Sequence, residues 1–183
     1  MKKLKIFYPK NSLKINKPTI IMLTLVAIIV LIHFSKKIFP ENFENLDLLS
    51  FAVIVITFVY FVFYLIYINF SHETENGNYS GYLIIENDKI TCDNKTYLLN
   101  EIEKISILEI YYRGKFNGKT LALVPKRSNG LKNYIEIHTN NKIDKYYFLQ
   151  TKKENVKMLF RNELKVYYER GLIGKHNFEN IMN

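Results

Sequence analysis

Two long runs of apolar residues dominate the N-terminal part of the chain. Residues 19–34 and residues 48–70 contain no Asp, Glu, Lys or Arg. The second run is long enough to cross the roughly 30 Å hydrocarbon core of a bilayer. The first is about 24 Å long as a helix, and two lysines behind it have side chains that reach the interface. The pattern predicts an N-terminal hairpin of two transmembrane helices, at about 18–38 and 47–70.

A cleavable signal peptide also combines lysines with an apolar stretch, and it is the alternative to an uncleaved first helix. No small-x-small cleavage site follows the first run, which continues as His33-Phe34-Ser35-Lys36-Lys37. The second apolar run begins within fifteen residues. Pro18 suits the first turn of a helix, and Pro40 ends one. These features favour an uncleaved helix.

Residues 71–78 form a polar hinge, after which the pattern changes to short segments separated by turn residues. Alternation of apolar and polar residues is clearest at Tyr134–His138, where Ile135 and Ile137 fall on one strand face. Turn pairs such as Asp93-Asn94 tolerate the positive φ that closes a hairpin. The pattern predicts seven strands, at about 80–86, 89–92, 95–99, 104–113, 119–125, 132–139 and 143–149.

The last segment changes to a helical period. Thr151 and Glu154 have the spacing of a capping box, and Gly171 is placed to end the helix. One face of this helix carries Val156, Leu159, Phe160, Leu164 and Tyr167. The predicted fold class is α+β: a cytoplasmic Lys-rich segment (1–17), the helical hairpin, and a domain of seven antiparallel strands capped by a helix (79–171), with a tail at 172–183.

This order of elements resembles the pleckstrin-homology (PH) superfold, in which a C-terminal helix closes one end of a bent antiparallel sheet. The similarity is carried by Gly81–Ile85, by the step from Tyr97 to Ile102 into a long strand, and by the helix from Thr151. Together with the hairpin, it resembles small bacterial membrane proteins with a C-terminal PH-like domain. The resemblance implies a binding or scaffolding role. Lipid-binding members place basic residues in the first hairpin, whereas this one is Glu86–Lys89, so specific phosphoinositide binding is not expected.

Six lysines precede the first apolar run, with no acidic residue among them. Such flanks mark the cytoplasmic side of a membrane and are attracted to anionic lipid. Two crossings return the chain to that side, which predicts a multi-pass protein of a bacterial inner membrane with both termini in the cytoplasm. Tyr60 is expected to hydrogen-bond to the first helix near Thr24. The residues expected to anchor the helices at the interface are Lys14, Lys17, Tyr64 and Tyr67.

The formal charge of +9 raises the question of a nucleic-acid partner. More than half of the excess lies in the lysines before the first helix, so membrane topology explains it better and no nucleic-acid partner is predicted. A second basic group, interleaved with aromatic residues, follows the fourth predicted strand. A surface for anionic lipid or an acidic partner and ordinary solvated loops both fit this group. The candidate residues are Arg113, Lys115, Phe116, Lys119, Lys126, Arg127 and Lys132.

The sequence contains no recognisable catalytic arrangement. Cys92 is the single cysteine, so it forms no intrachain disulfide and is expected to be a small semi-buried residue. The four histidines lack metal-ligand spacing, and the glycines form no phosphate-binding loop. Glu136 and His138 share a strand face, an acid–base pair in principle but more commonly surface neighbours. No cofactor, no metal and no enzymatic activity are predicted.

The leading hypothesis is a membrane-tethered cytoplasmic binding module of PH-like fold, acting as an adaptor, regulator or accessory subunit. Its expected partners are the bilayer and a protein, because tethering raises the effective concentration of the domain for other membrane components. The alternatives are an immunity protein that neutralises a toxin, a membrane-surface sensor of anionic lipid and, less favoured, a membrane enzyme. The sequence leaves the identity of the partner and self-association open.

Overall fold

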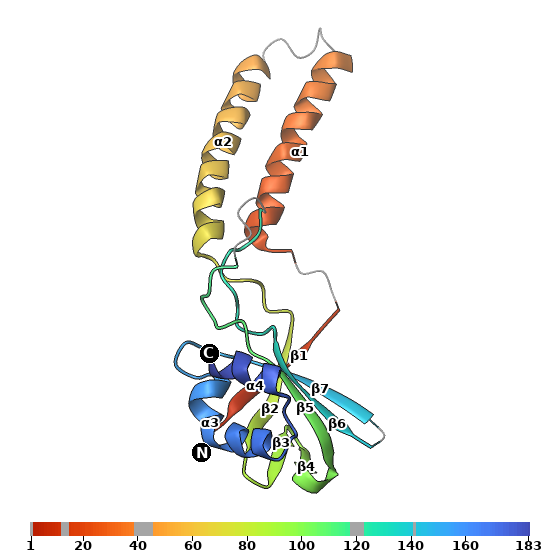
Figure 1. Cartoon of the computed structure of the whole chain (residues 1–183). Helices are drawn as coiled ribbons and strands as arrows, with labels where there is room; N and C mark the ends of the chain where they lie inside the picture. Colours follow the sequence, from red (N-terminus) through yellow and green to blue (C-terminus); the bar gives the residue numbers. More distant parts are fainter. Residues whose placement is uncertain (1, 12–14, 39–45, 118–122, 141) are drawn as a thin grey trace.

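The computed structural model consists of two long helices and a mixed domain of strands and short helices at one end of them (Figure 1). It describes residues 2–11, 15–38, 46–117, 123–140 and 142–183. Both ends of the chain lie in the mixed domain, so the chain leaves this domain to form the long helices and then returns to it (Figure 1). The architecture is α+β, as predicted.

The two long helices, α1 (Lys17–Ile38) and α2 (Leu46–Phe70), lie side by side. Both are long and apolar enough to cross a membrane. No residue of α1 is buried, and large side chains of α2 such as Phe58, 67% exposed, point away from the protein. Soluble proteins rarely expose so much contiguous apolar surface. The two membrane-length helices predicted from the sequence are therefore confirmed, and their outer surface is suited to lipid.

In the described part of the chain, seven strands form one antiparallel sheet in the spatial order β4-β3-β2-β1-β7-β6-β5. Two runs of consecutive strands, β1 to β4 and β5 to β7, are joined where β1 pairs with β7. A short 3₁₀ helix, η2, connects β4 to β5. The bounds are β1 Leu4–Pro9, β2 Gly77–Ile85, β3 Lys89–Cys92, β4 Lys95–Leu98, η2 Leu99–Glu101, β5 Ile102–Leu108, β6 Asn133–Thr139 and β7 Lys142–Phe148.

The first strand corrects the predicted domain boundaries. Residues 1–17 were expected to be a Lys-rich segment outside the domain, but β1 lies in the middle of the sheet between β2 and β7. Leu4 and Ile6 are 2% and 0% exposed, while Lys5 between them points outward. This alternation is that of a half-buried strand. The long helices are thus inserted between two neighbouring strands, instead of preceding the domain.

The strand predicted at 119–125 falls mostly on residues that the structure does not describe. Residues 118–122 lie outside the described residues, and residues 123–125 have no strand conformation. The predicted strand 104–113 begins earlier and ends at Leu108. A long connection, residues 109–132, therefore leads from β5 to β6, and we call it the β5–β6 loop. Among the described residues the sheet has seven strands, and β1 is one that the sequence did not predict.

Helix α3 (Val156–Glu169) closes the core of the domain. Its residues Phe160, Leu164 and Tyr167 are fully buried against strand residues such as Phe148. The Tyr167 hydroxyl donates hydrogen bonds to the backbone oxygens of the β2–β3 turn, so the helix is fixed to the sheet by polar as well as apolar contacts. The predicted helical core face is confirmed, with Leu159 packed at its margin.

The start of α3 differs from the predicted capping box. Thr151 Oγ1 accepts a hydrogen bond from the Glu154 backbone nitrogen at 3.0 Å, but both residues belong to a turn before the helix. The N-cap is Asn155, whose Oδ1 accepts from the Met158 nitrogen at 2.8 Å. Asn is at least as favourable an N-cap as Thr, so the sequence is compatible with a helix that begins after Thr151 or after Asn155. Gly171, with φ of 76°, follows the end of the helix as predicted.

The predicted tail, residues 172–183, is also part of the domain. It contains α4 (Lys175–Met182), and Ile173 and Ile181 are buried in the core. The segment covers the outer edge of β5: the Ile105 nitrogen donates to the Leu172 oxygen at 2.8 Å. The Asn177 side chain accepts from the Ile107 nitrogen at 2.9 Å and donates to the Ile107 oxygen at 2.6 Å. Unpaired backbone groups on an edge strand promote aggregation, and here those of Ile105 and Ile107 find their hydrogen-bond partners within the same chain.

We expect Asn177→Ala to expose this edge. Loss of both side-chain hydrogen bonds to Ile107 should destabilise the contact by about 1–2 kcal/mol and accelerate amide exchange at Ile107 about tenfold. Exchange at Ile135 in the middle of the sheet should stay unchanged. Asn180→Ala, on the exposed face of α4, serves as the control. Equal exchange at Ile107 in both variants would show that Asn177 does not protect the edge.

Candidate functional site at the membrane end of the domain

The β5–β6 loop lies between the sheet and the base of the two long helices (Figure 1). Three buried polar residues organise it where it returns to β6: Ser128, Asn129 and Asn133. Ser128 Oγ accepts from the Gly130 nitrogen at 3.0 Å, and Asn129 Oδ1 accepts from the Leu131 nitrogen at 3.1 Å. Such local bonds replace the ladder of a strand and hold the loop in one shape.

Asn133 connects the two ends of the loop. Its Oδ1 accepts from the nitrogens of Ile110 and Tyr111 at 3.1 and 2.9 Å. Its Nδ2 donates to the oxygens of Gly130, at 2.9 Å, and Tyr111. The side chain is 0% exposed and its amide makes four hydrogen bonds, which is its full capacity. Asn133 is therefore the central fixing point of the loop.

The loop also binds the end of α2. The Lys126 nitrogen donates to the Ile68 oxygen at 2.9 Å, and the Arg127 nitrogen donates to the Ser71 oxygen at 3.2 Å. The Arg127 guanidinium lies 5.6 Å from the centre of the Phe70 ring. The last backbone carbonyls of a helix have no partner within the helix, and here the loop supplies one. The domain and the helix end are thus joined by more than the connecting chain.

Two predicted site residues form ion pairs with the hinge after α2. Lys132 pairs with Glu73, and the Arg113 guanidinium lies 3.6 Å from a Glu75 carboxylate oxygen. These cations are each about half exposed. Opposite charges at this distance favour the closed arrangement of loop and hinge, although solvent weakens each pair. Part of the predicted basic surface therefore serves to hold the loop on the hinge.

The other predicted residues lie along the same loop. Lys115 Nζ donates to the Ile110 oxygen at 2.8 Å, and Phe116 is 53% exposed. The backbones of Phe116 and Arg127 form an isolated antiparallel bridge. Lys126 is half-buried, and Lys119 lies outside the described residues. The structure thus brings the described members of the predicted set together, but several of their contacts are made within the protein.

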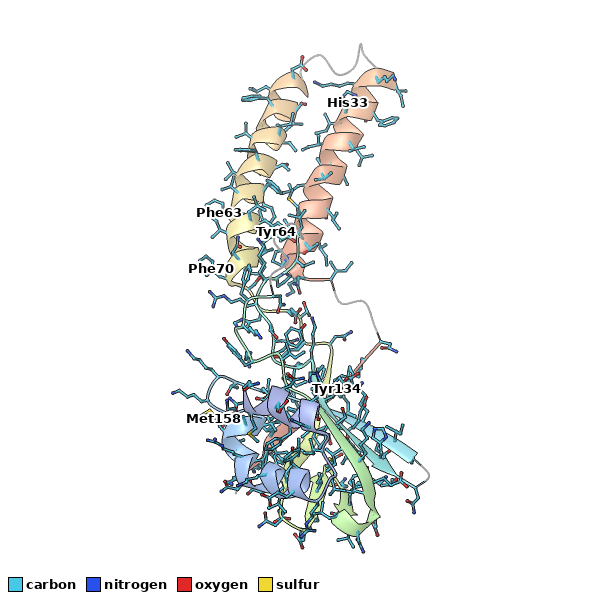
Figure 2. The ribbon with its side chains drawn as sticks, viewed as in Figure 1. His33, Phe63, Tyr64, Phe70, Tyr134 and Met158 are labelled. Atoms are coloured by element: carbon cyan, nitrogen blue, oxygen red, sulfur yellow. The ribbon has the colours of Figure 1, made fainter. Side chains whose placement is uncertain are left out.

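The tyrosines of α2 take different positions from those expected. Tyr64 is only 4% exposed, and its hydroxyl lies 3.0 Å from Thr19 Oγ1 and donates to the Leu123 oxygen at 2.9 Å. Figure 2 shows it between the helices, with Phe63 on the outer side of α2. The Tyr60 hydroxyl donates to the Pro18 oxygen at 3.0 Å. Tyr64 therefore joins α1, α2 and the β5–β6 loop.

Two expectations concern the helix interface: the hydrogen bond of Tyr60 and the residues at the base of the helices. The expected hydrogen bond from Tyr60 to the first helix is confirmed, but its acceptor is the Pro18 oxygen near the start of α1. The Thr24 hydroxyl donates to the Ile20 oxygen at 2.9 Å within its own helix. Tyr67 is 43% exposed, and Lys17 is the exposed first residue of α1. Lys14 lies outside the described residues. Tyr67 and Lys17 thus lie at the base of the helices, where interfacial residues were expected.

A cleft of about 420 Å³ opens where β1, the hinge and β6 meet. One wall is aromatic: the rings of Tyr134 and Tyr147 are 5.8 Å apart in an edge arrangement, and Lys145 Nζ lies 3.5 Å from the centre of the Tyr134 ring. Figure 2 labels Tyr134 at the end of the domain that faces the helices. The polar and charged residues that line the cleft include Lys10, Thr74, Asn129 and Lys132. The sequence analysis missed this cleft because it placed Lys10 outside the domain.

The described residues contain no group of three or more His, Cys, Asp or Glu side chains arranged to hold a metal ion. Cys92 is fully buried, beyond the expected half-burial, and burial raises the pKa of its thiol. Glu136 pairs with Lys145 at 2.9 Å and not with His138. A buried thiol with a raised pKa is a poor nucleophile. These observations provide no support for the acid–base alternative at Glu136 and His138.

Glu109, at the start of the loop, is a carboxyl group that the sequence analysis did not single out. Burial raises its pKa from 4.5 to about 7, and a hydrogen bond from the Lys157 backbone at the start of α3 only partly opposes this. One of its oxygens is buried without a hydrogen-bond partner among the described residues. The group therefore changes charge near neutral pH, at the point where the loop leaves the sheet.

We expect Glu109 to make the domain less stable as the pH rises. A raised pKa favours the protonated folded state, so its stabilisation is complete below pH 4.5 and is lost as the pH rises through about 7. In detergent, wild type should lose about 1–2 kcal/mol relative to Glu109→Gln over this interval, allowing for solvent screening. Thermal unfolding at several pH values measures the difference. Glu103→Gln, exposed on β5, should show no such difference from wild type.

Comparison with known proteins yields no relative for this chain: no protein-family model, no curated protein and no solved structure matches it. Its function must therefore be argued from its own geometry.

Proposed function

We propose that this chain is a membrane-anchored binding module of PH-like architecture, which holds an adaptor or regulatory domain against the cytoplasmic face of a bacterial inner membrane. The anchor is the pair α1 and α2, and the binding surface is the cleft between β1, the hinge and β6. The domain contributes recognition, and the anchor confines it to the membrane, which raises its effective concentration for membrane partners.

One observation carries this proposal: β1, which precedes α1, pairs with β2, which follows α2. The Lys5 and Tyr82 positions are paired, as are Pro9 and Gly77. Neighbouring strands cannot pair across a bilayer, so a membrane-inserted hairpin must leave and re-enter the domain on one side. The lysines before α1 then favour the cytoplasmic side. This supports a two-crossing anchor with both termini in the cytoplasm.

The strand order supports the PH-like part of the proposal. Two runs of consecutive antiparallel strands meet at β1 and β7, and a helix after the last strand closes the core. This order agrees with the PH-like arrangement that the sequence resembles, an antiparallel sheet followed by a C-terminal helix. The chain departs from the expected arrangement in one respect, because its membrane anchor interrupts the domain after the first strand. Architecture alone does not establish a binding role, because unrelated functions share one fold. The binding role proposed here therefore depends on a partner that occupies the cleft.

The topology is tested by labelling single introduced cysteines in intact spheroplasts with a membrane-impermeant maleimide. Native Cys92 is fully buried and should stay unlabelled. Asn42→Cys, between the helices, should react from outside, whereas Lys3→Cys and Lys153→Cys should react only after the membrane is opened. Reaction of Lys3→Cys and Lys153→Cys from opposite sides would contradict the proposed anchor.

The binding role is tested with a photo-cross-linking amino acid at Tyr147, in the cleft, in the full-length protein in native membranes. Thr96, exposed on the distant edge strand β4, is the matched control position. We expect a discrete protein adduct from Tyr147 and none from Thr96, with mass spectrometry identifying the partner. The same set of adducts from both positions, or none from Tyr147, would count against the cleft as a binding surface.

A further inference from the structure

We infer that Leu123 and Val124 of the β5–β6 loop enter the lipid bilayer beside α1 and α2, forming a third membrane contact of the domain. The inference rests on the proposed anchor and adds to it a segment that the hydropathy of the chain does not identify. The occupant of this surface is the lipid itself, at the boundary between headgroups and acyl chains.

The depth of the segment follows from its bond to α2. The Leu123 oxygen accepts from the Tyr64 hydroxyl at 2.9 Å, and Tyr64 lies six residues before the end of α2 at Phe70. Six residues of helix correspond to about 9 Å. With 25 residues α2 is about 37 Å long, longer than the roughly 30 Å hydrocarbon core, so its last turn lies among the headgroups. Leu123 is therefore at the level where acyl chains begin.

The polarity along the loop matches this placement. Leu123 and Val124 are 54% and 44% exposed and pack into no core of the protein. The next cations, Lys126 and Arg127, are bound at the backbone to Ile68 and Ser71, at the end of α2. Apolar side chains thus lie deeper than the cations, in the order that an interfacial segment requires.

The backbone of the segment is adapted to the low polarity of this level. An exposed carbonyl in a bilayer is costly unless it is hydrogen-bonded, and Tyr64 supplies the donor for Leu123. Pro125 has no N–H that needs a partner. Tyr64 itself is almost fully covered, since Thr19 of α1 contacts the same hydroxyl. The two helices and the loop therefore share one polar contact, and the apolar side chains remain directed outward.

The test places a bimane fluorophore on single introduced cysteines of the full-length protein. The vesicles consist of phosphatidylcholine and phosphatidylglycerol, with part of the phosphatidylcholine carrying a nitroxide on its acyl chain. Val124→Cys is the test position, and Leu123→Cys repeats it in case one variant fails to fold. Phe58→Cys, exposed in the middle of α2, is the membrane control. Met158→Cys, 64% exposed on α3, is the aqueous control. Native Cys92 is buried and takes no label.

We expect the nitroxide lipid to quench the Val124 label clearly, as it does the Phe58 label, and to leave the Met158 label bright. Iodide in the water should quench the Met158 label most strongly. If the Phe58 label is quenched by lipid while both loop labels behave like Met158, the loop lies outside the bilayer and this inference is wrong, although the anchor stands. If the Phe58 label is not quenched by lipid either, the proposed anchor itself is wrong. The two failures are therefore distinguishable.

Discussion

Replacement of residues 11–75 by a two-residue Asn-Gly turn is expected to yield a soluble, folded domain without its helices. The ends of the excision are already adjacent: the Lys10 nitrogen donates to the Asn76 oxygen at 2.9 Å, and the Asn76 side chain donates to the Lys10 oxygen at 2.9 Å. Asn-Gly forms the tight turn that joins such antiparallel strands. Circular dichroism should be mainly that of β-structure, and thermal unfolding should be cooperative.

The matched comparison is the fragment 76–183, which lacks β1. It loses the strand between β2 and β7 together with the buried side chains of Leu4 and Ile6, and it should aggregate or remain unfolded. Ile6→Ala in the joined domain should cost about 2–5 kcal/mol of unfolding free energy, because Ile6 is fully buried. If the fragment 76–183 unfolds as cooperatively and at the same temperature as the joined domain, β1 is not part of the sheet.

Asn133→Ala is expected to release the β5–β6 loop from its fixed shape. The substitution leaves the partly buried nitrogens of Ile110 and Tyr111 without their acceptor and removes two donated bonds. Leaving buried polar groups unsatisfied costs about 1–3 kcal/mol each, so a total of about 2–4 kcal/mol is expected. Limited trypsin digestion of the full-length protein in detergent should then cut faster after Lys126 and Arg127, and the unfolding temperature should fall.

Asn162→Ala is the control for this change, because Asn162 is exposed on α3 and Ala is well tolerated within a helix. Its digestion and unfolding should match wild type within about 0.5 kcal/mol. Unaltered cleavage after Lys126 and Arg127 in Asn133→Ala would show that the loop is held mainly by its contacts with α2 and the hinge. The importance assigned to Asn133 would then be wrong.

The elements that local pattern determines were the ones that sequence analysis predicted well. Helix α3 repeats its apolar residues with a helical period, and Phe160, Leu164 and Tyr167 are buried as expected. The hairpin at Asp93-Asn94 was predicted from turn chemistry, and Asp93 has a positive φ of 57°. The two long helices follow from hydropathy alone. Each of these signals lies within one continuous segment of the chain.

The first strand was missed because two physical signals overlap in the same residues. The lysines that indicate membrane topology alternate with Leu4 and Ile6, so a basic flank and a half-buried strand have the same sequence there. Its pairing with Phe148, 142 positions later in the chain than Ile6, leaves no local trace. Long-range pairings of this kind depend on the whole fold and not on the segment alone.

The candidate site was predicted in its composition but not in its contacts. The basic residues of the β5–β6 loop are near each other in sequence, so their proximity was predictable. Their partners Glu73 and Glu75 are far away in the chain. Through these ion pairs, Lys132 and Arg113 connect the loop to the hinge. The cleft was not predictable, because it needs β1, the hinge and β6 together.

The interruption of the domain after β1 has a consequence for how the protein is made. The ribosome releases β1 first, but both of its neighbours, β2 and β7, are synthesised only after α1 and α2. Until then β1 has no strand to pair with, and loop closure over such a separation is slow. In the proposed topology, this central strand stays unpaired on the cytosolic side while the hairpin enters the bilayer. If the hairpin is inserted in this way, the domain completes its sheet at the membrane surface, after β2 and β7 have been synthesised.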